Sequence, residues 1–130
     1  MVQTGLEALV EAGGGEWKGR KIGLVTNPTG VLADGTSGIE ALRAVGVKLG
    51  ALFGPEHGVR GDVPAGKYIA NYTDPKSGLP AYSLYGKTRQ PNAAMLRGLD
   101  ALAFDLQDVG ARSYTCLSTL GEVMKATASH

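Results

Sequence analysis

A short segment rich in glycine and proline carries the side chains best suited to chemistry. Residues 54–62 read Gly-Pro-Glu-His-Gly-Val-Arg-Gly-Asp and follow an apolar run that ends at Phe53. Glycine and proline shape a backbone but bury little surface, so such a loop suits the presentation of polar groups from a rigid strand end. We interpret Glu56 as the principal candidate for proton transfer, with His57 beside it. The alternatives are a solvated loop acid and a structural, hydrogen-bonded histidine.

A second polar segment spans residues 104–115, Phe-Asp-Leu-Gln-Asp-Val-Gly-Ala-Arg-Ser-Tyr-Thr. Asp108 has two candidate roles: a group of the functional site, or the cap of a following helix that pairs with Arg112 four residues on. Asp105 lies in an otherwise apolar run, where an unpaired carboxylate would be costly. We therefore expect Asp105 to have a partner, either Arg112 or a backbone turn.

Hydrophobic spacing predicts the elements that position these segments. Helices are expected over residues 5–12, 38–44, 91–97 and 110–128, with Ser37 as an N-cap and Leu117, Leu120 and Met124 along one apolar face of the last helix. Short apolar runs predict buried parallel strands over 22–25, 47–53, 81–85 and 99–106. Residues 63–80 show no clean period and are expected to form a long excursion. This alternation is typical of an α/β, Rossmann-like fold with a mainly parallel sheet flanked by helices.

Polar residues gather at the carboxyl end of every predicted strand, which is the edge where open α/β sheets bind ligands. The sequence therefore predicts a single site at this edge. The residues concerned are Asn27 after the first strand, Glu56 and His57 after the second, Tyr85 at the end of the third, and Asp105, Gln107, Asp108 and Arg112 at the fourth.

Composition excludes several classes of function. Thirteen Lys and Arg against twelve Asp and Glu give a formal charge of +1, which argues against nucleic acid or an anionic membrane as partner. No apolar run approaches a membrane span, and the first residues do not read as a signal peptide, so the compartment stays undetermined. No His or Cys spacing suits a metal, and the lone Cys116 is expected in the core. Neither a Gly-x-Gly-x-x-Gly nor a Walker loop is present, so no metal and no nucleotide cofactor is expected.

Four ordered blocks of sequence nevertheless resemble a known family. They are residues 23–30 (Gly-Leu-Val-Thr-Asn-Pro-Thr-Gly), 54–62, 79–86 (Leu-Pro-Ala-Tyr-Ser-Leu-Tyr-Gly) and 104–115. Together they are similar to the bacterial exo-β-N-acetylmuramidases of the NamZ type, long catalogued as a domain of unknown function. The resemblance extends over about residues 5–128.

The resemblance implies a two-domain glycosidase with its active site in a cleft between a Rossmann-like domain and a smaller C-terminal domain. Such enzymes release N-acetylmuramic acid from the non-reducing ends of peptidoglycan fragments during cell-wall turnover and recycling, and many are exported to the periplasm or the medium. Residues 1–130 then correspond to the N-terminal portion of the Rossmann-like domain. Because the C-terminal domain that completes the cleft is absent, the fragment is expected to be inactive alone.

The family's catalytic acid corresponds to Glu56, which would protonate the glycosidic oxygen as an oxocarbenium-like centre develops. His57 or Asp108 would orient this acid or a water molecule. Arg60 or Arg112 would hold the lactyl carboxylate of muramic acid. The substrate-binding set is completed by Asn27, Tyr85 and Gln107. The alternative function is a non-catalytic α/β module that binds a sugar or a metabolite.

Overall fold

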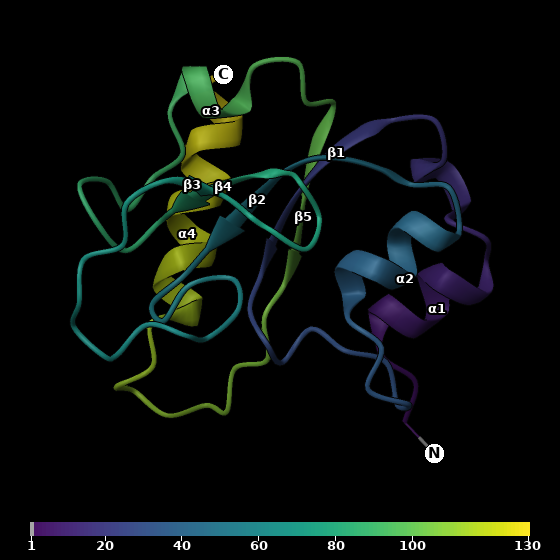
Figure 1. Ribbon diagram of the computed structural model, residues 1–130, viewed down its shortest axis with the longest axis horizontal. Helices are drawn as coiled ribbons and strands as arrows, with labels where there is room; N and C mark the ends of the chain where they lie inside the picture. The colour runs from purple at the N-terminus through teal and green to yellow at the C-terminus, as the bar shows by residue number, and fades with distance from the viewer. Residues whose placement is uncertain (1) are drawn as a thin grey trace.

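The computed structural model describes residues 2–130, which form a five-stranded sheet with helices on both faces (Figure 1). Strands β1, β2, β4 and β5 are parallel to their neighbours in the order β4-β2-β1-β5, and β3 adds an antiparallel edge beside β4. The predicted fold class is therefore confirmed. The elements are α1 (Gly5–Glu11), the 3₁₀ turn η1 (Gly15–Trp17), β1 (Lys21–Thr26), α2 (Gly38–Ala44), β2 (Lys48–Gly54), β3 (Tyr72–Thr73), β4 (Pro80–Ser83), α3 (Ala93–Leu96), β5 (Ala101–Asp105) and α4 (Cys116–Ser129).

Two hydrophobic clusters cover the two faces of the sheet. Successive strand residues point to opposite faces, so Leu24 joins one cluster and Val25 the other. The first cluster includes Leu6 of α1 and Leu42 of α2, and the second includes Val123 of α4. In Figure 1, α1 and α2 accordingly lie to the right of the strands, and α4 lies to the left with α3 near its end. The sheet is buried between two helical layers, as parallel sheets require.

A bulge in β2 keeps its hydrophobic side chains on the correct faces. Leu49 and Leu52 both belong to the first cluster although they are an odd number of residues apart, which a regular strand does not allow. The register shifts by one residue between Ile22, opposite Leu49, and Gly23, opposite Ala51. Gly50 is the extra residue on β2. Because of it, Ala51 and Leu52 point to the same faces of the sheet as Gly23 and Leu24 on the neighbouring strand.

Helices α1 and α2 begin where the sequence predicts. Ser37 caps α2 by accepting a hydrogen bond from the Ile39 amide at 3.3 Å. Thr4 and Glu7 form a reciprocal capping box at α1. None of the helices within residues 2–130 is long and apolar enough to cross a bilayer.

The predicted start and the predicted inner face of the last helix were both wrong. Residues 106–115 form a loop, and α4 begins at Cys116. Leu117 and Met124 are 73% and 62% exposed, and the buried positions are Cys116, Thr119, Val123 and Ala126. The Thr119 hydroxyl donates to the Thr115 carbonyl at 2.9 Å, so this polar side chain is buried without an unsatisfied group. The short strand β3 inside the 63–80 excursion was also missed.

Candidate active site

The carboxyl ends of β1, β2 and β5 meet at one edge of the sheet and enclose a hollow of about 520 Å³. Three of the loops predicted to carry functional residues therefore converge. The lining residues include Asn27 and Thr29 after β1, Glu56 and His57 after β2, and Gln107, Ser113 and Tyr114 after β5.

A tight turn directly after β2 places Glu56 at this hollow. The Gly58 amide donates to the Pro55 carbonyl at 2.9 Å, and His57 has a φ of 70°, the one positive φ of a non-glycine residue within 2–130. The turn folds back over the strand end so closely that a Cβ on Gly54 would lie 2.8 Å from the Val59 nitrogen. Only glycine fits at position 54, because the close atom belongs to the backbone.

The Glu56 side chain is half-buried and is oriented by the excursion that follows it. Its Oε1 accepts a hydrogen bond from the Gly66 amide at 3.2 Å. The carboxylate thus has one oxygen fixed by protein backbone while the group remains at the wall of the hollow. This arrangement holds a carboxyl group where a bound ligand would meet it.

His57 is exposed and anchors the same loop. Its Nδ1 lies 2.9 Å from the Val63 carbonyl oxygen and donates to it, because a carbonyl only accepts. The Val63 amide in turn donates to the His57 carbonyl at 3.4 Å. These contacts favour the structural interpretation of His57 and leave its Nε2 as the ring atom available to a ligand.

Asn27 and Gln107, which follow the neighbouring strands β1 and β5, are joined through Thr29. The Gln107 amide donates to the Thr29 hydroxyl oxygen at 3.2 Å, and that hydroxyl donates to Asn27 Oδ1 at 2.6 Å. The Thr29 amide also donates to Asn27 Oδ1, at 3.0 Å. The Asn27 carboxamide is therefore fixed with its NH₂ group available for a ligand. Thr29 was not among the predicted site residues, although it lies in the 23–30 block.

The remaining predicted site residues do not line this hollow. The Arg60 guanidinium pairs with Asp74, and Tyr85 lies under the guanidinium of Arg89 at 4.4 Å from its ring centre. Asp108 accepts from the Gly110 amide at 2.7 Å in a local turn. Arg112 is exposed, and the two ion pairs found within the described residues, Arg60–Asp74 and Lys125–Glu122, do not include it.

Two expectations for the second polar segment were wrong. Asp108 does not cap α4, because the helix begins later and its N-cap residue is Thr115. Asp105 has neither predicted partner: its Oδ2 is buried and accepts no hydrogen bond from any residue in the described part of the chain. Burial raises the pKa of the Asp105 carboxyl, since removal from water disfavours the charged form.

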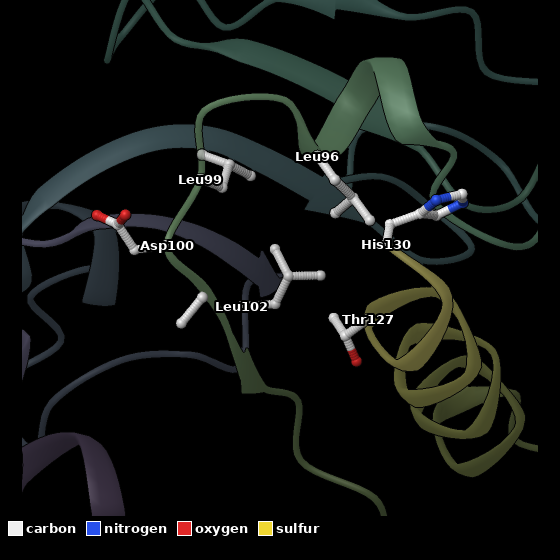
Figure 2. A pocket seen from close by; sticks show the side chains of 7 residues that line it. Leu96, Leu99, Asp100, Leu102, Thr127 and His130 are labelled. Atoms are coloured by element: carbon white, nitrogen blue, oxygen red, sulfur yellow. The ribbon is translucent and has the colours of Figure 1, made fainter.

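Another hollow, of about 490 Å³, lies at the opposite, amino end of β5. Figure 2 shows Leu96, Leu99 and Leu102 on one side of it and Thr127 and His130 on the α4 side. Its acidic residue, Asp100, accepts a hydrogen bond from the Lys21 amide at 2.6 Å and so serves the start of β1. This hollow lies away from the carboxyl edge of the sheet. Across residues 2–130, no three His, Cys, Asp or Glu side chains gather as a metal would require.

The fold and the hollow define an α/β domain with a carboxylate-bearing candidate site at the carboxyl edge of a mainly parallel sheet. The sequence pattern of the family described as "Exo-beta-N-acetylmuramidase NamZ, N-terminal" matches residues 22–130. The chain belongs to this family, and the predicted resemblance is confirmed.

Similar proteins agree with this assignment. The chain is 49% identical over 126 residues to the peptidoglycan β-N-acetylmuramidase NamZ of Bacillus subtilis (strain 168), covering 96% of this chain and 30% of that protein. A crystal structure of a DUF1343 family protein from Bacteroides fragilis NCTC 9343 matches with a TM-score of 0.87 and 48% identity over 98% of this chain and 32% of its own. A second such protein from the same organism matches with a TM-score of 0.76 and 30% identity, over 96% and 31% of the two chains. The chain thus spans about a third of the length of these relatives.

Proposed function

We propose that this chain supplies part of the active site of an exo-acting β-N-acetylmuramidase, which releases N-acetylmuramic acid from the non-reducing ends of peptidoglycan fragments. The observation that carries the proposal is the position of Glu56. In a domain of this family, Glu56 is the carboxyl group that lines the hollow at the ligand edge of the sheet. Its loop is held by the Gly58–Pro55 and Gly66–Glu56 hydrogen bonds.

Glu56 acts as the general acid in this proposal. The bond between the anomeric carbon and the glycosidic oxygen breaks with its electron pair on the oxygen, which takes the proton of Glu56. In net terms, water supplies hydroxide to the anomeric carbon and returns a proton to Glu56. The Asn27 carboxamide and the exposed Gln107 side chain line the same hollow and are placed to hold hydroxyl or acetamido groups of the sugar.

The site is completed by polypeptide that this chain does not contain. The relatives are about three times as long as the matched region, which leaves room for the predicted C-terminal domain. Val109 and Tyr114 line the hollow and yet are 66% and 52% exposed. Apolar side chains grouped at the rim of a site are typical of a surface that another part of a protein covers. We propose that this rim contacts the C-terminal domain and that the fragment alone has no turnover.

The test is the substitution Glu56→Gln in the full-length protein, assayed on a chromogenic N-acetylmuramide. Loss of a general acid typically lowers the rate by about 10²- to 10⁴-fold, so a loss in that range is expected. Glu16→Gln, which changes an exposed carboxyl on η1, is the matched control and should retain full activity. Wild-type turnover by Glu56→Gln would reject Glu56 as the acid. Saturable binding of the sugar without turnover by either protein would favour a non-catalytic module.

A further inference from the structure

A second, smaller hollow of about 190 Å³ lies against the same two loops as the candidate active site. Asn27 lines both hollows. Glu56 and Arg60 belong to the one loop after β2, and Glu56 lines the larger hollow whereas Arg60 lines the smaller. The loops are in close contact, since a Cβ on Gly61 would lie 2.6 Å from the Pro28 ring. The two hollows therefore lie against the same pair of loops and share Asn27 in their lining.

The lining of the smaller hollow is cationic. Its charged residues are Arg60 and Lys76, its polar side chains are Thr26, Asn27 and Ser37, and no Asp or Glu is among them. Lys76 is exposed and takes part in neither of the ion pairs formed by the described residues. A site with two cations and neutral donors suits an anion.

Arg60 is held in place before any ligand binds. Its Nε and Nη2 donate to the two oxygens of Asp74 at 2.9 and 2.7 Å, and Asp74 is fully buried. The Ser77 amide and hydroxyl also donate to Asp74, at 2.8 and 2.6 Å. Nη1 makes no hydrogen bond to any carboxylate within residues 2–130, so it remains available to a ligand. A fixed guanidinium loses little conformational entropy on binding.

The charges around the hollow decide which anion fits. Asp74 neutralises the charge of Arg60, and Lys76 has no such partner in the lining. The lining therefore retains a net charge of +1, which suits a ligand with a single negative charge. The acid facing Arg60 from the helical layer is Glu40 on α2, which is exposed and therefore screened by solvent. The pKa of Arg60 is raised, first by its hydrogen bonds to Asp74, and the guanidinium stays charged throughout the neutral range.

We propose that this hollow binds the carboxylate of the 3-O-lactyl group of N-acetylmuramic acid, with Lys76 and Arg60 Nη1 as its partners. The proposal rests on the proposed function, because that function supplies the sugar. The lactyl ether is on C3, away from the anomeric carbon, so a ring whose C1 lies at Glu56 carries its carboxylate beyond the larger hollow. The lactyl group is also what distinguishes muramic acid from glucosamine. Lys76 and Arg60 would thus determine specificity, and Arg112 would not.

The experiment compares binding of N-acetylmuramic acid and N-acetylglucosamine, two sugars that differ in the lactyl group alone. Titrations followed by NMR use the full-length protein carrying Glu56→Gln, so that binding is read without turnover. We expect a preference for N-acetylmuramic acid. Lys76→Gln should weaken its binding about tenfold, the loss expected for one charge-assisted hydrogen bond. Binding of N-acetylglucosamine should not change.

Two further variants sharpen the test. Lys76→Arg, which retains the charge, should restore most of the preference, and Glu40→Gln should strengthen binding of N-acetylmuramic acid about twofold by removing a nearby negative charge. Equal binding of the two sugars, or a Lys76→Gln protein with unchanged preference, would overturn the assignment even if hydrolysis is observed. Competition by inorganic phosphate without a preference between the sugars would indicate a general anion site and would also overturn it. Conversely, an intact preference in a protein whose turnover does not need Glu56 would reject the catalytic proposal alone.

Discussion

Arg60 and Asp74 form a two-pronged ion pair that ties the loop after β2 to the segment before β4. The Nε–Oδ1 and Nη2–Oδ2 distances are 2.9 and 2.7 Å, and the Asp74 side chain has no exposed surface. The pair fixes the loop that presents Glu56 on its other side. Stability of the domain and geometry of the site therefore depend on the same contact.

Asp74→Asn should lower the free energy of unfolding by about 3 kcal/mol, because it leaves a partly buried guanidinium without its counter-charge. Glu122→Gln, in the exposed Lys125–Glu122 pair, is the matched control and should cost less than about 0.5 kcal/mol. Urea unfolding at neutral pH measures both. Equal effects of the two substitutions would contradict a special role for the Arg60–Asp74 pair.

The same pair predicts how the protein responds to acid. Hydrogen bonds from Arg60, followed by those from Ser77, hold the pKa of Asp74 well below its usual range. A lowered folded-state pKa gives stability that is present above the unfolded value and is lost as the pH falls toward the folded value. The wild-type protein should therefore lose this contribution only below the ordinary range of aspartate titration. Asp74→Asn should show no such loss over that interval when unfolding is followed from pH 5 to about pH 2.

Asp105 should show the opposite dependence on pH. Burial raises the pKa of its carboxyl, so the folded state binds the proton more tightly than the unfolded state. The free energy of unfolding should therefore decrease as the pH rises from the ordinary aspartate pKa through the folded value. Asp105→Asn has no such titration, and its advantage over the wild type should grow across this interval and level off above it. A constant difference between the two proteins at every pH would contradict the prediction.

His57 allows backbone strain to be separated from hydrogen bonding. Its φ of 70° is unfavourable for any residue with a Cβ, and its Nδ1 donates to the Val63 carbonyl. His57→Ala loses the hydrogen bond and keeps the strain, whereas His57→Gly loses both. We expect His57→Gly to be more stable than His57→Ala by about 1 kcal/mol in thermal unfolding. Equal stability would mean that the turn relaxes to negative φ.

The orientation of α4 can be tested with two substitutions to alanine in the 130-residue chain. Val123 is 4% exposed and belongs to the second core cluster, so Val123→Ala should cost about 1–2 kcal/mol. Leu117 is 73% exposed, and Leu117→Ala should change stability by less than about 0.5 kcal/mol. A larger loss of stability for Leu117→Ala than for Val123→Ala would indicate that Leu117 lies on the inner face of α4, as the sequence predicted.

The sheet was predictable because its strands are short apolar runs of the kind that only a buried parallel sheet accommodates. The first and last residues of each predicted strand are within two residues of those of an observed strand, and α2 has the predicted bounds. The order of polar residues at the strand ends follows directly, which is why Asn27, Glu56 and Gln107 were expected together and line one hollow.

The parts that were missed depend on tertiary contacts. Nothing in the spacing of Arg60 and Asp74 links them, because the connection is a loop without a period. In α4, Leu117 and Met124 are spaced at a helical period, just as the buried residues are, so spacing alone does not identify the inner face. Thr119 can lie on the inner face because its hydroxyl donates a hydrogen bond to the Thr115 carbonyl. Strand β3 was missed because two residues are too few to show the alternation of polar and apolar side chains that identifies a strand.

The hydrogen bond between Thr29 and Gln107 spans a sequence separation of 78 residues. Contacts of such range form slowly, because the intervening chain must be ordered before they add stability. During synthesis, Glu56 and Asn27 emerge long before β5 can dock beside β1 and bring Gln107 to the hollow. The hollow is therefore among the last features of the domain to form. In a nascent chain that ends before β5, Glu56 lies on a surface that lacks the residues contributed after β5.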